Sequence, residues 1–221
     1  MNIDSDQVMI EAYYQANEGS PYSRQNVKIK RLKFALSEKQ RHELLERSMA
    51  MNPLHALMIE LQMKTGLRAG ELVHLRIENV NLTEGCIYIT RDVEAGWFPK
   101  TPSSFRRIPL DHGMIVKLRG HLSKRRSGYV FQSQRGPRFS VKGYINTVNE
   151  RAKQCKSIGR AIGSHSLRRT YASYLSKEGL EISAISRYMG HESVRTTLLY
   201  LYEIDSLESD ERHNEIVGGM V

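Results

Sequence analysis

Five stretches of the sequence carry polar side chains that a hydrophobic core does not need. They hold arginines, histidines, a lysine and a tyrosine, which can bind anions, transfer protons or act as nucleophiles. Taken singly, each has an ordinary structural explanation, because such residues usually lie on a solvated face or pack near a helix end. The stretches are Thr65–Leu72, Lys100–Leu110, His165–Thr170, Met189–Ser193 and Thr196–Tyr200.

Helical spacing indicates how two of these side chains are displayed. His165 and Arg168 are three residues apart, so both lie on one side of a helix. We expect the pair at the edge of that helix's apolar stripe or off it. The stripe consists of Leu167, Tyr171, Tyr174 and Leu175.

The last predicted helix, residues 194–203, distinguishes two tyrosines. Its expected buried stripe is Val194, Leu198 and Leu201. At about 100° per residue, Tyr202 lies near this stripe and Tyr200 points roughly opposite. The spacing therefore predicts that Tyr202 packs and that Tyr200 displays its phenol.

Lys100 stands in a loop between two predicted strands. It is the only lysine between Lys64 and Lys117. A mobile amine at such a loop can reach a ligand, because loops are where binding residues concentrate.

The elements that position these residues are mostly helical. Ser37 and Gln40 form a capping-box pattern that opens the folded body. Period-2 alternation predicts two strands, 86–90 and 106–110, which form a small antiparallel sheet. The fold class is α+β, mainly α, without the βαβ alternation of a Rossmann or P-loop enzyme. Helices are predicted over about 37–49, 53–65, 69–76, 111–124, 166–178, 182–189 and 194–203, with a further helical face from Val141 to Val148.

The charge of the chain is concentrated in its middle. The formal net charge is +9 and the pI is near 9.6, yet residues 1–22 and 203–221 are acidic. A basic body suggests a polyanionic partner such as nucleic acid, although a solvated basic surface has the same composition. Candidate phosphate-contacting residues are Lys124, Arg125, Arg126, Arg135, Arg138, Lys142, Arg151 and Lys153.

Other classes of protein are not supported by the composition. No run of about 18 apolar residues predicts a transmembrane helix, and the N-terminus lacks the pattern of a signal peptide. The two cysteines, Cys86 and Cys155, are therefore expected to be reduced thiols in a cytoplasmic protein. No Gly-rich phosphate loop, paired-cysteine motif or HExxH is present, and no Asp/Glu cluster suggests a metal site.

Together and in this order, the five stretches resemble the tyrosine recombinase (phage integrase) family. The resemblance covers about residues 36–203 and is most specific from Ser164 to Tyr202. It implies the helical catalytic domain of enzymes that cut and rejoin DNA at specific sites through a 3′-phosphotyrosyl intermediate and a Holliday junction. It also implies double-stranded DNA as the partner, a homo-tetramer assembled on that DNA, and no cofactor or metal.

The resemblance assigns the phosphate chemistry to four residues. Tyr200 would be the nucleophile that attacks the phosphodiester. Arg68 and Arg168 would hold the two non-bridging oxygens, because guanidiniums match the growing charge of a five-coordinate transition state. Lys100 would be the general acid for the leaving 5′-oxygen.

The remaining roles that the resemblance implies are supporting ones. His165 would help take the tyrosine proton, which a phenol of pKa about 10 does not release readily at neutral pH. His191 would hydrogen-bond the phosphate and help to place Tyr200. Glu71 matches the acidic position of the family and would orient the helix turn after Arg68.

The N-terminal region departs from the family pattern. Only about 35 residues precede the catalytic domain, fewer than the usual core-binding domain that closes around DNA. The expected organisation is an arm over 1–35, the catalytic domain over 36–203, and an acidic tail over 204–221 that packs on a neighbouring protomer or is disordered. The chain is then a minimal recombinase or a truncation.

Two other functions fit the same sequence. A type IB topoisomerase shares the phosphotyrosyl chemistry but relaxes supercoils as a monomer. A DNA-binding regulator of the same fold binds without cutting.

Overall fold

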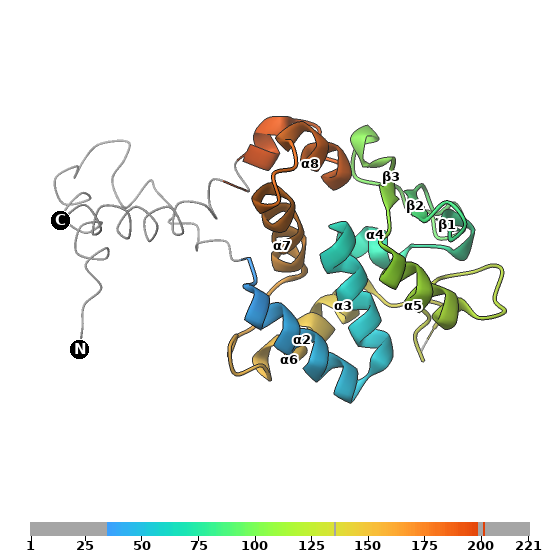
Figure 1. The fold of residues 1–221 in the computed structure, drawn as a ribbon. Helices are drawn as coiled ribbons and strands as arrows, with labels where there is room; N and C mark the ends of the chain where they lie inside the picture. The colour runs from blue at the N-terminus through green and yellow to red at the C-terminus, as the bar shows by residue number, and fades with distance from the viewer. Residues whose placement is uncertain (1–34, 135, 199–200, 202–221) are drawn as a thin grey trace, which may run out of the picture. The chain divides into compact units, whose positions relative to one another are not determined.

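The computed structural model describes residues 35–134, 136–198 and 201. They are mainly helical, with one small antiparallel sheet at one side of the helices (Figure 1). The α+β, mainly helical class predicted from the sequence is confirmed. Among the described residues, no helix is both long enough and apolar enough to cross a bilayer.

The first two helices of the described residues are joined at a single residue. α2 (Glu38–Met51) begins at the predicted capping box, in which Ser37 and Gln40 bond each other's backbone N–H. Asn52 then ends α2, and its side chain accepts a bond from the first turn of α3 (Pro53–Thr65). The sharp junction follows from this shared cap, and it brings α2 alongside α3.

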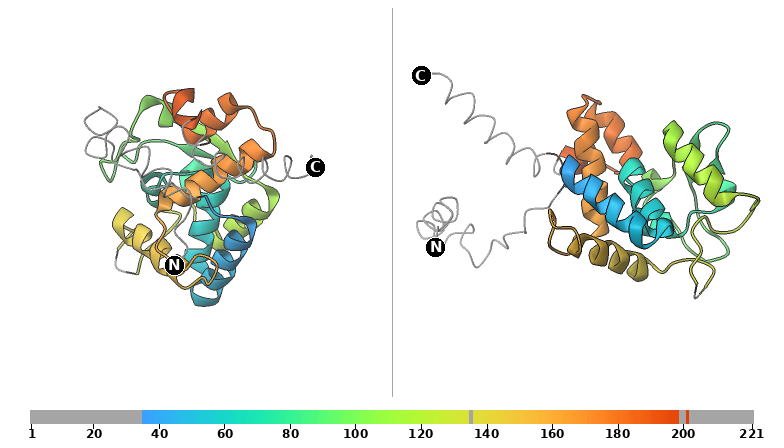
Figure 2. Two further views of the ribbon diagram at one scale, coloured as in Figure 1. Left: turned by 90° about the vertical axis from the view of Figure 1, so that its left-hand side faces the viewer. Right: turned by 60° about the horizontal axis from the view of Figure 1, so that its bottom comes forward.

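α3 runs through the middle of the helical layer and is buried along most of its length (Figures 1 and 2). Its buried polar side chain, Gln62, donates to Leu67 O at 2.8 Å and accepts from Tyr144 Oη at 2.7 Å. These bonds satisfy a polar group that would otherwise be costly to bury. Gly66 ends α3 in the left-handed conformation, with φ +63°.

The sheet contains the predicted hairpin and one further strand. Its order is β1 (Val80–Asn81), β2 (Cys86–Ile89), β3 (Arg106–Pro109), and both pairs are antiparallel. Ile87 pairs with Ile108, so the two buried isoleucines face the core together. β1 was not predicted, because two residues are too few to show alternation.

α4 (Ala69–Val73) is shorter than predicted. The sequence favours a helix to Arg76, but His74 ends it, and Arg76 is extended, with φ −97° and ψ 153°. Arg76 instead forms a bridge with Tyr129 from a distant part of the chain. A tertiary pairing therefore overrides the local helix preference.

The four helices that follow the sheet lie close to their predicted ranges. They are α5 (His112–Leu122), α6 (Val141–Lys153), α7 (Ser164–Lys177) and α8 (Ile182–Met189). α7 begins two residues earlier than predicted, which places His165 inside its first turn. A further helix begins at residue 194, as the sequence predicts.

Of the three residues predicted to form the buried face of that helix, only Leu201 is buried. Val194 and Leu198 are 44% and 46% exposed, whereas Leu201 is 4% exposed. The helix turns the face of Thr197 and Leu201, four residues apart, toward the protein. On this face the Thr197 hydroxyl is buried and bonded to His191, and Leu201 packs with Tyr171 and Met189.

Two apolar clusters form the core of the described part. The larger one contains residues of the helices from α2 through α6, of the sheet and of the start of α7. Both cysteines are buried and are free thiols. Tyr174 of α7 was expected in the buried stripe but is 46% exposed, with Arg41 stacked 5.0 Å from its ring centre. The smaller cluster consists of Tyr171, Ala172, Ile185, Met189 and Leu201.

We expect Gly66→Ala to lower the free energy of unfolding by about 2–4 kcal/mol, measured by urea denaturation. An added Cβ would lie 2.4 Å from Cδ1 of Tyr171, and the left-handed backbone adds its own strain. Gly179→Ala is the control, because Gly179 has φ +80° but nothing within 4 Å of a Cβ. It should cost only about 1–2 kcal/mol. Equal losses of unfolding free energy in the two variants would show that the Tyr171 side chain moves away from the new Cβ at little cost.

Candidate active site

Arg168 is a cation buried between the ends of two helices. Its side chain donates to Gly66 O at the end of α3 and to Met189 O at the end of α8. Carbonyls at a helix C-terminus carry partial negative charge and lack helical partners, so a guanidinium suits them. Arg168 is 2% exposed, deeper than the helix-edge position predicted from the sequence.

Arg68 lies just before α4 and reaches the same turn. Its Nη2 donates to Gly190 O at 2.8 Å, and its Nη1 donates to Glu71 Oε1 at 2.8 Å and Ser104 Oγ at 3.0 Å. The side chain keeps 23% of its surface exposed. It is therefore fixed by three elements and still open to a ligand.

A third arginine, Arg106 of β3, completes the arrangement. Its Nε donates to Tyr188 O at 2.7 Å. Three consecutive carbonyls at the end of α8 thus accept bonds from three arginines that come from β3, α7 and the segment before α4. We call residues 188–190 the carbonyl turn.

Gly190 is required where these groups meet. Its φ is +61°, and a Cβ would lie 2.9 Å from Arg106 Nη1 and 3.0 Å from Ser103 O. A residue without a side chain therefore lets the arginines approach the turn.

Glu71 balances part of this positive charge. Its carboxylate, 1% exposed, accepts both Nη atoms of Arg106, at 3.0 and 2.9 Å, as well as Arg68 Nη1. Burial opposes ionisation, but the hydrogen bond from Arg106 and the charges of Arg106, Arg168 and Arg68 outweigh it and lower the Glu71 pKa. The role expected for Glu71, orienting the helix turn after Arg68, stays a prediction.

His191 follows the carbonyl turn directly. Its Nδ1 lies 2.8 Å from Thr197 Oγ1 of the last helix. Burial, followed by the charges of Arg168, Arg68 and Arg106, lowers the pKa of His191 to about 3. The imidazole is therefore neutral at physiological pH, and it links the three arginines to the helix that carries Thr197.

His165 stands in the first turn of α7 with an exposed surface. Its pKa is lowered by partial desolvation and by the charges of Arg168, Arg169, Arg68 and Lys100. The imidazole is therefore in its neutral form, which is the form that can accept a proton, although the positive field makes it a weaker base.

The structure therefore brings together most of the predicted site. Arg68, Arg168 and His191 meet at the carbonyl turn, and Lys100, an exposed loop residue, contributes to the field at His165. Tyr200, the predicted nucleophile, lies outside the described residues, as does Tyr202.

Sequence reasoning included Arg106, Ser104 and Thr197 in the polar stretches but assigned them no role. A signal for Arg106 existed, because it is two residues from buried Ile108 and so shares its face of β3. Thr197 carried no such signal, because its burial depends on the bond to His191.

Several predicted phosphate-contacting residues also have structural roles. Arg125 donates to Tyr129 O and Val130 O, and Arg138 lies 5.8 Å from the Tyr129 ring centre. Arg126 bonds nearby carbonyls, Arg151 contacts His55, and Lys153 pairs with Glu150. Lys124 and Lys142 are exposed, and Arg135 lies outside the described residues.

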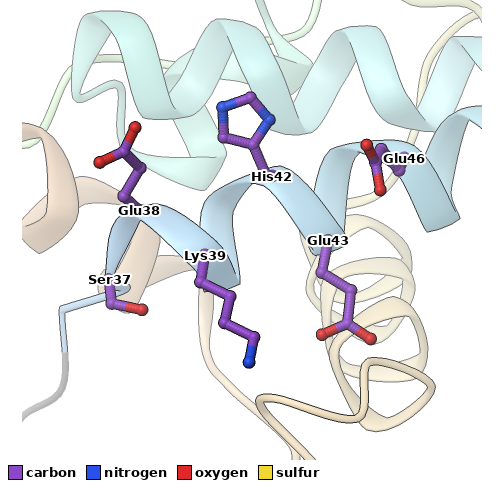
Figure 3. A pocket seen from close by; sticks show the side chains of 6 residues that line it. All are labelled: Ser37, Glu38, Lys39, His42, Glu43 and Glu46. Atoms are coloured by element: carbon purple, nitrogen blue, oxygen red, sulfur yellow. The ribbon is translucent and has the colours of Figure 1, made fainter.

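A hollow along α2 contains none of the predicted site residues. Figure 3 shows its six lining residues, with Lys39 and Glu43 pointing away from His42. Glu43 instead accepts bonds from Ser157 N at 2.9 Å and Lys156 N at 2.7 Å, which tie the loop before α7 to α2. Across residues 35–134, 136–198 and 201, no group of three or more His, Cys, Asp and Glu side chains is placed to hold a metal.

With this geometry established, comparison with known proteins decides the family. The family model described as "Phage integrase family" matches residues 35–205. The chain belongs to the phage integrase family. The resemblance inferred from the five polar stretches is therefore confirmed.

Curated members of this family align with the same region. The tyrosine recombinase XerD of Pseudomonas aeruginosa is 29% identical over 153 residues, which are 66% of this chain and 48% of that protein. A tyrosine recombinase of Pseudothermotoga lettingae is 29% identical over 171 residues, 76% of this chain and 56% of that protein. The chain thus spans about half the length of the curated relatives it matches.

Solved structures share the fold. The XerA recombinase superposes with a TM-score of 0.66 and 22% identity, covering 95% of this chain and 76% of that one. The Tn1549 transposon integrase, solved in complex with transposon right end DNA, gives 0.69 with 19% identity, covering 96% and 80%.

We expect Glu71→Gln to lower the free energy of unfolding at pH 7 by about 3 kcal/mol, since one partner of a buried ion pair loses its charge. The depressed Glu71 pKa stabilises the fold above the ordinary value of 4.5, and this stabilisation is lost as the pH falls through the folded value. The free energy of unfolding, measured between pH 3 and 7, should therefore fall less steeply toward low pH (a flatter acid limb) for the variant than for the native chain. Glu94→Gln is the control, because Glu94 is 74% exposed in its pair with Arg76. Matching acid limbs for native and Glu71→Gln would contradict this prediction.

We expect the His191 ring to stay neutral from pH 8 down to about pH 4, because its pKa is about 3. Histidine ring resonances followed by NMR through a pH titration measure this directly. Arg68→Ala removes one of the nearby positive charges and should raise the His191 midpoint. A native midpoint near 6.5, the ordinary value, would show that the field of the arginines is absent.

Proposed function

We propose that the chain acts as a site-specific DNA recombinase or integrase that cuts one strand through a 3′-phosphotyrosyl link and exchanges strands through a Holliday junction. The observation that carries the proposal is the carbonyl turn. It holds Arg68 and Arg168 on adjacent carbonyls, directly before His191. Two neighbouring guanidiniums fit the two non-bridging oxygens of one phosphodiester.

In the proposed cleavage step, the residues of this site account for each bond that forms or breaks and for each proton that moves. The Tyr200 phenol oxygen forms a bond to phosphorus, and its proton passes to His165. The phosphorus–O5′ bond breaks, and the 5′-oxygen takes a proton from Lys100. The covalent link keeps the bond energy for rejoining, so the reaction requires no nucleotide cofactor.

The arginines stabilise the transition state of this step. The phosphoryl group gains negative charge, and cations fixed in advance reduce the cost of that gain. Arg68 is partly exposed and can contact an oxygen directly, whereas Arg168 is 2% exposed. A phosphate reaches Arg168 only after the groups that cover it move. Neutral His191 can donate its ring N–H to the same phosphate.

The proposal includes the organisation of the chain. Residues 1–35 form an arm, 36–203 the catalytic domain and 204–221 an acidic tail. The partner is double-stranded DNA, on which four copies assemble in the cytoplasm. The net charge of +9 and the solved complexes of the Tn1549 integrase with DNA support a DNA partner.

We expect the native chain to form a covalent adduct with a suicide DNA substrate nicked beside the scissile phosphate, and Tyr200→Phe to form none. The nick lets the short product strand diffuse away, so the adduct accumulates and is seen as a shifted band on a denaturing gel. Tyr202→Phe is the matched control and should retain the adduct. An adduct in Tyr200→Phe that disappears in Tyr202→Phe would identify Tyr202 as the nucleophile.

The same substrate separates the rival functions. Relaxation of supercoiled plasmid without a target sequence would identify a topoisomerase. Retention on DNA with no adduct from the native chain would identify a regulator that binds without cutting. Strand exchange between two target-site DNAs supports the recombinase.

A further inference from the structure

The only tryptophan of the chain stacks on a histidine of the segment that follows α4. The Trp97 and His74 rings are 4.6 Å apart at their centres and 8° from parallel. Trp97 comes from the loop between β2 and β3, which also carries Lys100. The stack therefore joins that loop to the element that begins at Arg68.

The histidine is held in one orientation. His74 Nδ1 lies 2.8 Å from Gly70 O, and because a carbonyl only accepts, Nδ1 carries the proton. Burial lowers the His74 pKa, so the ring is neutral and the stack is between two uncharged rings. The indole also covers Gly70, where a Cβ would lie 3.6 Å from Nε1. Trp97 thus packs on α4 itself, between the positions of Arg68 and Glu71.

The backbone of Trp97 is also paired within the loop. Trp97 and Asp92 exchange two backbone bonds of 2.9 Å each. Asp92 is 1% exposed and accepts the Tyr129 hydroxyl at 2.7 Å. The backbone of Trp97 is therefore fixed by its bonds to Asp92, and its indole ring is fixed against His74 and Gly70.

Lys100 is held between this anchor and a second one. Lys100 comes three residues after Trp97, and the next residue is Thr101. The Thr101 Oγ1 lies 3.0 Å from Ser104 Oγ. Ser104 Oγ in turn accepts Arg68 Nη1 at 3.0 Å. Both ends of the Lys100 segment are therefore tied to the same element, upstream through Trp97 and downstream through Ser104.

We propose that Trp97 is a positioning residue that sets Lys100 against Arg68. Trp97 touches neither the phosphate nor the reacting atoms. Its effect on the reaction passes through the place of the Lys100 amine relative to the guanidinium. The inference rests on the proposed function, in which Lys100 protonates the leaving 5′-oxygen.

A substrate that needs no general acid isolates this effect. When sulfur replaces the bridging 5′-oxygen, the phosphorus–sulfur bond breaks and the sulfur leaves as a thiolate without a proton. Loss of the Lys100 amine should then matter little, whereas general damage to the site should slow both substrates equally. The comparison of oxygen and sulfur DNA therefore reports on delivery of the proton alone.

The experiment measures the rate of adduct formation on nicked DNA with oxygen or sulfur at the 5′-bridging position. On oxygen DNA we expect Lys100→Ala to lose about 100-fold or more and Trp97→Ala to lose on the order of 10- to 100-fold. On sulfur DNA both should return to within about threefold of native, because no proton is required.

Matched variants complete the design. Phe98→Ala changes an adjacent aromatic residue that is 62% exposed and should leave both rates unchanged. Trp97→Phe keeps a ring and should retain most of the oxygen rate. His74→Ala keeps Trp97 but removes its partner, so it should shift the single-tryptophan emission to longer wavelength and slow oxygen DNA selectively.

The outcomes separate the inference from the function on which it rests. If Trp97→Ala is folded and slows both DNAs by the same factor, or matches native on oxygen DNA, the positioning role is wrong. If Trp97→Ala does not fold, His74→Ala decides by the same criterion. If the native chain forms no adduct on either DNA, the proposed function itself is wrong.

Discussion

The site depends on one buried guanidinium placed between two helix ends. Arg168 donates to the last carbonyls of α3 and α8, and these helices otherwise end close together with unpaired acceptors. A cation at that point neutralises the negative ends of two dipoles and fixes the angle at which α8 approaches α3. The carbonyl turn is placed by this contact, and Arg68, Arg106 and His191 take their positions from the turn.

The charge of the cluster remains positive after its internal pairing. One buried carboxylate, Glu71, meets the guanidiniums of Arg68 and Arg106, while Arg168 is bonded to carbonyls. Burial, together with this excess charge, lowers the pKa values of both His165 and His191, so the imidazoles are neutral where the surroundings are cationic. Such an arrangement is unfavourable in isolation and becomes favourable when an anion enters, which is the property a phosphate site requires.

The helices and the hairpin were predictable because their signals are local. Ser37 caps α2, Gly66 ends α3, and the alternation around Ile87 marks β2. The polar stretches also indicated Arg68, Arg168 and His191. The depth of Arg168 and the burial of Thr197 were not predictable, because each depends on a partner more than five residues away or on another element.

The glycine at the carbonyl turn makes the gene unusually sensitive at one codon. Every amino acid that a single-base change can substitute for glycine brings a Cβ, and at position 190 that atom meets Arg106 and a backbone oxygen. A new side chain there displaces an arginine and strains the link to His191 together. Missense variation at this codon should therefore be purged as strictly as variation at the arginines themselves, although the residue has no functional group.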